Sequence, residues 1–429
     1  MDHNKLKYIP GPENITRRVL PNGVRILLWK NPWSRSAQVR VSLPTGNYLN
    51  PAGKNSLADY TAAMLMNGTE RHDFHKIHEM LEYSGASMNF SAYTANLTGS
   101  VNCLSEDLPA MLELLKEVLD KPVFPSEYVE LVRQKVLTSY RLAMQDPETL
   151  ADEAFDHLLY GDTPYGIPSF GSEEVIRGIT REDLVEFHRR YYGPAGMVIA
   201  IAGGIDISAA AELCERIFGT WQTSQQVVDT AACFPDVPKP DREIREHIEI
   251  PEKSEMELVI GTMGPKRGDP EFTAAQIGNS IFGEFGMMGR IGEIVREENG
   301  LAYDIGSSLD SLKYGGSWSV DAGINPANLE KTTDLILREF RRFTTEKVTE
   351  EELDDVKSYA LGTLPFSFET NAGVASILTR IETYDLGLDH LLRAPDRIHS
   401  VTADAILAAA RKWLDPEKMV IISAGTSAK

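Results

Sequence analysis

Three histidines and a glutamate stand close together in the first part of the chain, at helical spacings. They are His72, His75, His78 and Glu79. His75 and His78 could share a metal ion, because side chains three residues apart are neighbours on a helix. The order offers no glutamate placed as a base and no obvious third ligand. We expect these histidines on the wet side of an amphipathic helix, and a metallohydrolase using them is an alternative.

A second group of residues with chemical potential lies between positions 282 and 303. Three glycines, at Gly283, Gly286 and Gly289, precede Arg296-Glu-Glu-Asn-Gly-Leu-Ala-Tyr303. Guanidinium and phenol groups can both donate hydrogen bonds to an oxyanion. The glycines let a loop pass close to other backbone, and Gly300 can end the helix that carries Arg296. No phosphate-binding loop is indicated, since the G-K-[ST] pattern is absent.

Composition narrows the possible partners. The chain of 429 residues has 63 acidic and 43 basic side chains, for a formal charge of −20. Such a negative charge disfavours binding to nucleic acids and to anionic membranes. Three distant cysteines, no signal-peptide-like start and no membrane-length apolar run make a cytoplasmic location the expectation.

The remaining elements alternate between strands and helices. Pro21-Asn22-Gly23 predicts a hairpin turn before a strand over 24–29. A helix is predicted over 56–66, ending before Gly68, with further helices over 108–119, 126–144 and 181–192. A strand over 197–202 follows the last of these.

An internal repeat reveals the domain organisation. Eight residues between 180 and 203 recur 222 positions later without a gap, as helix, turn and strand: Thr180, Arg189, Pro194, Met197, Val198, Ile199, Ala202 and Gly203 match Thr402, Arg411, Pro416, Met419, Val420, Ile421, Ala424 and Gly425. A looser echo links 108–127 with 329–350. The sequence therefore predicts an α+β protein with two homologous domains, 1–220 and 245–429, each an antiparallel-rich sheet packed with helices. Residues 221–244 form the linker.

The helix predicted over 56–66 resembles the signature helix of the pitrilysin and mitochondrial-processing-peptidase family. These are zinc peptidases with an inverted H-x-x-E-H motif shortly before a Gly-Thr pair. Counting back from Gly68-Thr69, the histidine positions fall on Asp59 and Ala63, and the glutamate position on Ala62. A third ligand, a glutamate on a later helix, would fall near Ser139 or Tyr140. The resemblance therefore implies a zinc site whose positions are vacated, so that no metal is expected in this chain.

The second half is similar to the same family over its glycine-rich loop and its R-E-x-x-G-L-A-Y signature. The resemblance implies that Arg296 and Tyr303 approach the zinc site and that Gly283, Gly286 and Gly289 contact substrate. Taken singly, Arg296 could form a surface ion pair and Tyr303 could pack at a strand end. The agreement of spacing and flanking residues favours the functional interpretation.

These features predict a non-catalytic subunit of a heterodimeric zinc peptidase, forming half of a clamp. A homologous H-x-x-E-H subunit would hold the zinc, while this chain encloses the peptide and points Arg296 and Tyr303 at the scissile carbonyl. The chain alone is not expected to cut peptides. The alternative is a peptide-binding or structural homologue without a role in proteolysis, and a homodimer is also possible.

Overall fold

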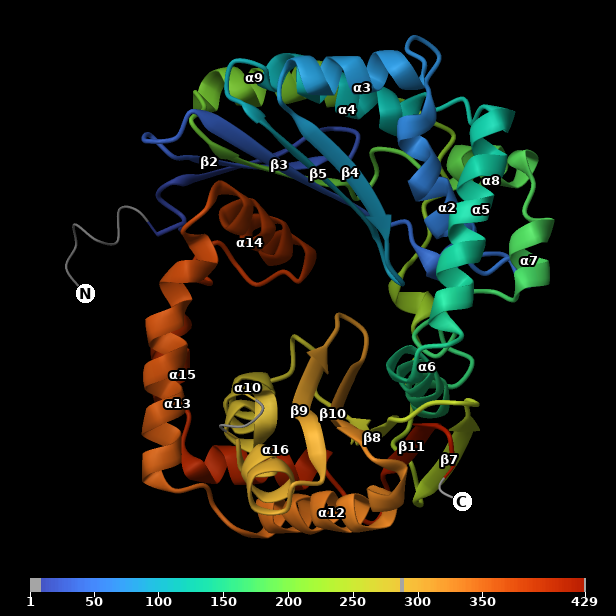
Figure 1. The fold of residues 1–429 in the computed structure, drawn as a ribbon. Coiled ribbons are helices and arrows are strands. Elements are labelled where there is room, and N and C mark those ends of the chain that lie inside the picture. The colour runs from blue at the N-terminus through green and yellow to red at the C-terminus, as the bar shows by residue number, and fades with distance from the viewer. Residues whose placement is uncertain (1–8, 286–288, 428–429) are drawn as a thin grey trace. The chain divides into compact units, whose positions relative to one another are not determined.

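The computed structural model describes residues 9–285 and 289–427, and it divides into two compact units (Figure 1). The first unit takes its described residues from Met1–Tyr140, Ser169–Thr230 and Leu364–Arg393. The second takes them from Arg141–Pro168, Ala231–Thr363 and Ala394–Lys429. Each unit contains one sheet packed against helices, which confirms the predicted fold class. None of the described helices is long and apolar enough to cross a membrane.

The first unit is built on a six-stranded sheet in the order β1-β2-β6-β3-β5-β4. Its strands are β1 (Ile15–Val19), β2 (Arg25–Lys30), β3 (Ser36–Leu43), β4 (Ser87–Ala92), β5 (Leu97–Leu104) and β6 (Val198–Gly203). Only the β2–β6 pair is parallel among these strands. The predicted turn joins β1 to β2, with Gly23 at a φ of +93° that favours glycine.

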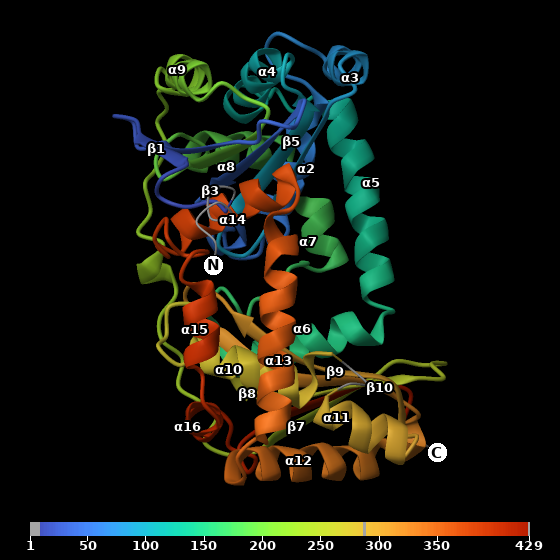
Figure 2. The same ribbon diagram turned by 90° about the vertical axis from the view of Figure 1, so that its left-hand side faces the viewer.

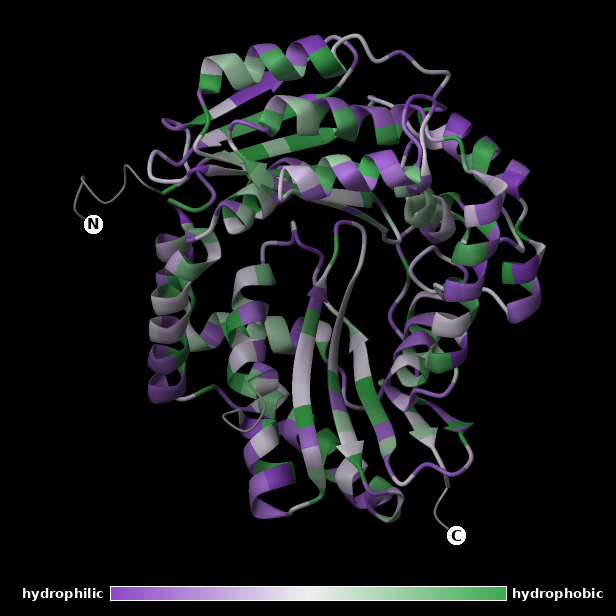
Figure 3. Ribbon diagram, turned by 45° about the horizontal axis from the view of Figure 1, so that its top comes forward, coloured by the Kyte–Doolittle hydropathy of each residue, from purple (hydrophilic) through white to green (hydrophobic). Residues whose placement is uncertain are grey.

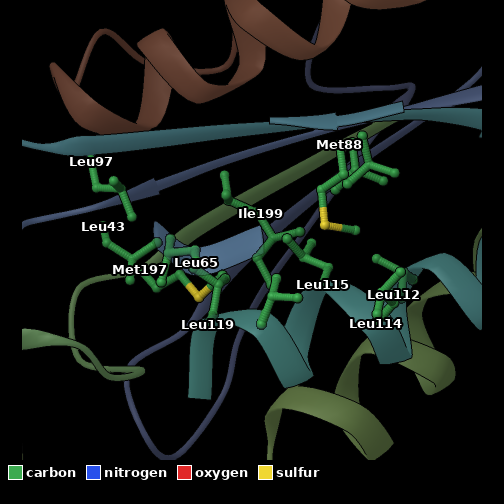
Figure 4. Close-up of a cluster of buried hydrophobic side chains, with 14 of the residues drawn as sticks. Leu43, Leu65, Met88, Leu97, Leu112, Leu114, Leu115, Leu119, Met197 and Ile199 are labelled. Atoms are coloured by element: carbon green, nitrogen blue, oxygen red, sulfur yellow. The ribbon is translucent and has the colours of Figure 1, made fainter. Parts of the chain in front are cut away.

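Helices cover both faces of this sheet. One face packs against α2 (Leu57–Met64), α3 (Phe74–Tyr83), α4 (Leu108–Asp120), α8 (Arg181–Tyr191) and α9 (Ile207–Phe218). The unit also contains α7 (Glu173–Gly178) and most of α5 (Ser126–Ala143). Leucines of α4 lie among apolar side chains of the sheet, such as Leu97 and Ile199 (Figure 4). These helices carry hydrophobic and hydrophilic residues on different sides (Figure 3), as amphipathic cover requires.

The second unit has a five-stranded sheet in the order β7-β11-β8-β10-β9. Its strands are β7 (Ile244–Glu249), β8 (Met256–Met263), β9 (Ala302–Ser311), β10 (Gly316–Ile324) and β11 (Val420–Gly425). Its helices are α6 (Pro147–Tyr160), α10 (Phe272–Asn279), α11 (Arg290–Gly292), α12 (Leu329–Thr345), α13 (Glu350–Thr363), α15 (Ala394–Ser400) and α16 (Ala403–Trp413). A core of α10, α12 and α16 side chains buries one face of the sheet.

The predicted repeat corresponds to matching elements in the two units. Helix α8 and strand β6 recur as α16 and β11, each displaced by 222 residues. Thr180 and Thr402 cap the two helices by accepting a backbone N–H three residues later. Strand β6 pairs parallel with β2 and antiparallel with β3, as β11 does with β7 and β8. The sequence repeat is therefore a repeat of topology.

The two units are not the contiguous segments 1–220 and 245–429. Helix α6 belongs to the first half of the sequence, but it packs on β8 and β11 of the second unit. Helix α14 (Asn371–Thr383) belongs to the second half, and it packs on β3 and β6 of the first unit (Figures 1 and 2). The physical reason is that both sheets also carry apolar residues on a second face, and the helix that covers these residues comes from the other half of the sequence.

Helix α14 is fixed to the first sheet by polar contacts at both of its ends. Near its start, the Asn371 amide donates to Ser34 Oγ at 2.9 Å. Near its end, the Glu382 carboxylate, only 7% exposed, accepts hydrogen bonds from Arg17 Nε at 2.9 Å and Nη2 at 2.7 Å. Arg25 Nη1 lies 3.3 Å from the same carboxylate. The hydrogen bond from Arg17 lowers the pKa of Glu382, which outweighs the opposing effect of burial.

We predict that Glu382→Ala destabilises the protein by about 2 kcal/mol, because it leaves Arg17 and Arg25 without their shared carboxylate. The pKa of Glu382 is lower in the folded state, so its contribution is present above its unfolded pKa and disappears as pH falls through the folded pKa. Thermal unfolding at pH 7.5 measures the effect. Glu186→Ala, which removes an exposed pair with Arg189, is the matched control and leaves Tm unchanged. Equal Tm values for both variants would contradict the prediction.

Candidate functional site

A pocket of about 470 Å³ lies in the first unit where the zinc motif was predicted to be vacated. Asp59, Ala63 and Asn67 contribute to its lining from α2 and the short helical turn Leu65–Asn67. They follow one another at intervals of four residues, so they share one side of the helical segment. Lys135 and Ser139 of α5 line the pocket as well. The structure therefore brings the two histidine positions and a third-ligand position to one cavity.

Two of the predicted zinc-site positions, Ala62 and Tyr140, do not line this pocket. Ala62, at the glutamate position, is 3% exposed and does not line the pocket. Of the two candidates for the third-ligand position, Ser139 lines the pocket, while the Tyr140 ring packs 6.3 Å from the ring of Phe170. Ser139 is therefore the better match to that position.

The residues around this pocket do not fit a zinc ion. Asp59 is its only carboxylate, and no histidine or cysteine lines it. Burial raises the pKa of Asp59 to about 6, although a hydrogen bond with Asn47 acts in the opposite direction. Structural and catalytic zinc sites need at least three nitrogen, sulfur or carboxylate ligands. Over residues 9–285 and 289–427, no group of three His, Cys, Asp or Glu side chains could hold a metal ion.

The histidine cluster lies on α3 and before it. His72 Nδ1 is 2.9 Å from Glu117 Oε1 of α4, while His75 and His78 pack against the ring of Phe74. Ile77 and Leu81 are buried on the other side of α3, as the amphipathic pattern predicts. The structure does not assemble these histidines into a metal site among the residues that it describes.

The backbone of the glycine-rich loop in the second unit lies close to neighbouring residues. A side chain at Gly289 would collide with Gly283 Cα, 2.6 Å from its Cβ position, and one at Gly283 would meet Ile291 at 2.4 Å. Gly286 lies outside the described residues. Gly300 has a φ of +60° and donates its N–H to Arg296 O, which confirms the predicted helix end.

Arg296 lies on the helical segment 290–298, which Arg290 anchors to the rest of the unit. The buried Arg290 guanidinium donates to both Glu352 carboxylate oxygens, at 2.5 and 2.8 Å. Burial raises the pKa of Glu352, but the hydrogen bonds from Arg290 and Thr349 together lower it to about 2. Arg296 itself is partly exposed, and no described residue forms a hydrogen bond or an ion pair with its side chain.

Tyr303 is the second residue of β9 and lies in a bulge that sets the direction of its side chain. Ala302 pairs with Ile324 and Asp304 with Gly323, so Tyr303 is the extra residue in the ladder. Its ring lies over Gly323, where an added Cβ would approach the ring at 2.5 Å. The phenol is 52% exposed and donates a hydrogen bond to Glu255 Oε2 at 2.9 Å. Burial and Glu255 together raise the pKa of Tyr303 to about 12.

The ring of Tyr303 lies at one end of a surface that we call the acidic face. It is the α6-bearing side of the five-stranded sheet, and its carboxylates come from four elements: Glu148, Asp152 and Asp156 of α6, Glu257 of β8, Asp304 and Asp310 of β9, and Asp321 of β10. The strand residues share this side because Val259 packs on α6, pairs with Asp321 and lies two residues from Glu257 on the same strand.

Burial and mutual repulsion raise the pKa values of carboxyl groups on the acidic face. Burial first, and neighbouring carboxylates second, raise the pKa of Glu257 to about 8 and that of Asp156 to about 7. The pKa values of Asp152 and Asp321 rise to about 6 for the same reasons. A positively charged group placed here would relieve this repulsion.

The acidic face was not predicted from the sequence. One signal was present, because Glu148, Asp152 and Asp156 recur at every fourth position of a helix. Their convergence with strand residues depends on α6 packing against a sheet that begins almost a hundred residues later. Glu255, the partner of Tyr303, was likewise missed.

We predict that Glu257→Gln raises Tm, and that the gain grows as pH rises from 6 to 8.5. The folded-state pKa of Glu257 is raised above its unfolded value, so its charged form destabilises the fold increasingly up to about pH 8. At pH 8.5 we expect a gain of roughly 2–4 °C, equivalent to about 1 kcal/mol. Glu351→Gln, on the exposed side of α13, is the control and shows no such trend. A pH-independent difference would contradict this account.

Two family models match successive parts of the chain. The model described as insulinase, peptidase family M16, matches residues 25–173. The model described as the peptidase M16 inactive domain matches residues 178–359. Together they span both units, although neither corresponds to one of them.

Curated relatives and solved structures agree with these matches. An uncharacterized zinc protease of Streptomyces coelicolor is 24% identical, over 94% of this chain and 88% of that protein. One of Mycobacterium tuberculosis is 27% identical, over 93% and 90%. The peptidase M16 inactive domain from Pseudomonas fluorescens superimposes with a TM-score of 0.90 and 26% identity, covering 97% of this chain and 98% of that one. A protease from Helicobacter pylori shares the fold, with a TM-score of 0.88 at 17% identity. The chain belongs to peptidase family M16, as a member that lacks the H-x-x-E-H motif.

Proposed function

We propose that this chain is the non-catalytic subunit of a heterodimeric zinc peptidase. A homologous subunit with an intact H-x-x-E-H motif holds the zinc ion and provides the activated water. This chain helps to enclose the peptide and offers Arg296 and Tyr303 to the scissile carbonyl. The supporting observation is that the pocket at Asp59, Ala63 and Ser139 lacks a zinc ligand set. The R-E-x-x-G-L-A-Y signature of the second half, which contains Arg296 and Tyr303, is nevertheless complete.

The geometry of Tyr303 is consistent with a role towards a substrate. The bulge turns its ring onto the acidic face, and half of its surface is open to solvent. A phenol at such a position can donate a hydrogen bond to an oxyanion. Glu255 must release the phenol first, because its carboxylate accepts the hydrogen bond in this structure.

Unlike Tyr303, Arg296 can contact a substrate without first breaking a hydrogen bond to another described residue. Its guanidinium is permanently charged, and no described side chain neutralises it. The Arg290–Glu352 pair fixes the start of the same helical segment, so Arg296 is carried by a rigid support. The acidic face beside Tyr303 favours peptides with basic residues, since opposite charges attract them during encounter.

A second candidate function is peptide binding without a contribution to proteolysis. The hydrogen bond from Tyr303 to Glu255 favours it, because a phenol held by a carboxylate has its proton already engaged. In that case Arg296 and Tyr303 would contribute to stability or peptide affinity only. The partner's turnover number would not depend on them.

We predict that Arg296→Ala and Tyr303→Phe each lower kcat of the complex by about 10²–10³, with small changes in KM, because each removes an oxyanion donor. The assay uses the chain copurified with an H-x-x-E-H homologue. Tyr359→Phe removes a hydroxyl from a tyrosine that is also 52% exposed, and Arg338→Ala removes an exposed arginine of α12. Both controls keep full activity. Undiminished kcat in the Arg296 and Tyr303 variants would support the second candidate function instead.

We predict that a chelator leaves the Tm of the isolated chain unchanged, because the predicted zinc position offers only one carboxylate. Elemental analysis of the same sample should find no stoichiometric zinc. The complex is the positive control, since it should lose activity under the same treatment. A lower Tm together with one equivalent of zinc per chain would show that the isolated subunit binds the metal itself.

A further inference from the structure

An aromatic pocket lies at the other end of β9 from Tyr303. Its volume is about 190 Å³, and five aromatic residues contribute to its lining: Tyr160, Tyr165, Phe234, Tyr314 and Trp413. They come from α6, from the segment after α6, from the segment before β7, from the β9–β10 turn and from α16. All of them belong to the second unit. We call this cavity the aromatic pocket.

The walls of the aromatic pocket hold one another in place. The Phe234 ring stacks on Tyr314 with centroids 4.9 Å apart, and it lies 4.7 Å from Tyr165. Tyr165 in turn lies 5.5 Å from Tyr160. A side chain at Gly315 would come within 3.2 Å of both tyrosine rings, so the glycine keeps this wall free of a side chain. Rings packed in this way form a preformed rather than an induced site.

Unpartnered polar groups distinguish this cavity from ordinary core packing. The Thr163 hydroxyl and the Trp413 indole N–H are buried, and neither has a hydrogen-bond partner within the described part of the chain. The Tyr160 hydroxyl is also buried, with Ser317 as its neighbour. All three residues line the aromatic pocket, and Tyr160 is only 3% exposed. Buried polar groups without partners are costly, which favours a ligand that both donates and accepts hydrogen bonds.

The size and the charges of the pocket restrict this ligand further. A cavity of about 150 Å³ can hold a benzene ring, so the aromatic pocket has room for one ring. A cationic ligand is disfavoured, because the chain's own Lys239 ammonium lies 4.6 Å from the centre of the Trp413 ring. A phenol satisfies both conditions, since it combines one ring with a hydroxyl that donates and accepts.

We propose that the aromatic pocket binds a tyrosine side chain of a peptide. The proposal rests on the proposed function for its ligand class, which is a peptide that lies along the acidic face. From Tyr303 to Ser311, β9 extends by eight residues, or roughly 26 Å. An extended peptide whose scissile bond lies near Tyr303 therefore places its tyrosine about eight residues away.

Binding of blocked amino acids by the isolated chain tests the pocket without any proteolysis. We expect N-acetyl-tyrosinamide to bind saturably by calorimetry and to change the fluorescence of Trp413. N-acetyl-phenylalaninamide should bind about tenfold more weakly, because it leaves the Thr163 hydroxyl and the Trp413 indole N–H unpaired. N-acetyl-alaninamide should not bind measurably. Equal binding of the tyrosine and alanine compounds, or no saturable binding at all, would overturn the proposal.

Two variants assign the binding to this pocket. Thr163→Val keeps the shape but removes one hydroxyl, so it should reduce the preference for tyrosine over phenylalanine at least threefold. Gly315→Leu should abolish binding by filling the cavity. Thr345→Val, which removes an exposed hydroxyl of α12, is the control. An unchanged preference in Thr163→Val would contradict the proposal even if Gly315→Leu fails to fold. Tyr303→Phe should leave this binding intact, so failure of the proposed function and failure of the pocket are separable.

Discussion

Each sheet in this protein carries apolar residues on both of its faces, and the burial of those on the second face is the constraint on which the remaining features depend. The helix that covers this face comes from the other half of the sequence: α14 covers the first sheet and α6 the second. Helix α6 brings Glu148, Asp152 and Asp156 to the acidic face and Tyr160 to the aromatic pocket. Neither surface would exist if the two halves folded as independent repeats.

The two units differ in which of the family's motifs they carry. In the first, the positions that would hold zinc in H-x-x-E-H peptidases line a pocket with a single carboxylate. In the second, the placement of Tyr303 depends on a bulge and on the glycine at position 323. The helical segment of Arg296 is supported by the ion pair between Arg290 and Glu352. This combination of features supports the proposed role as a subunit that assists another active site.

Much of the fold could be predicted from the sequence, because local patterns determine it. The gapless repeat located α8, β6, α16 and β11, and Gly300 located the end of the helix that carries Arg296. The exchange of α6 and α14 could not be predicted, since helical periodicity shows that a face is apolar but not which sheet it covers. For the same reason the acidic face, whose members are up to 173 residues apart between Glu148 and Asp321, was not foreseen. The choice between Ser139 and Tyr140 also needed the rotation of α5, which spacing alone does not fix to one residue.

The proposed role requires that this chain act through a partner subunit. The direct measurement is a titration of a purified H-x-x-E-H homologue with this chain, following peptide hydrolysis and complex mass together. We expect activity to rise with added chain and to saturate at one equivalent, where the mass corresponds to a heterodimer. Full activity of the homologue alone, unchanged by any excess of this chain, would contradict the central claim.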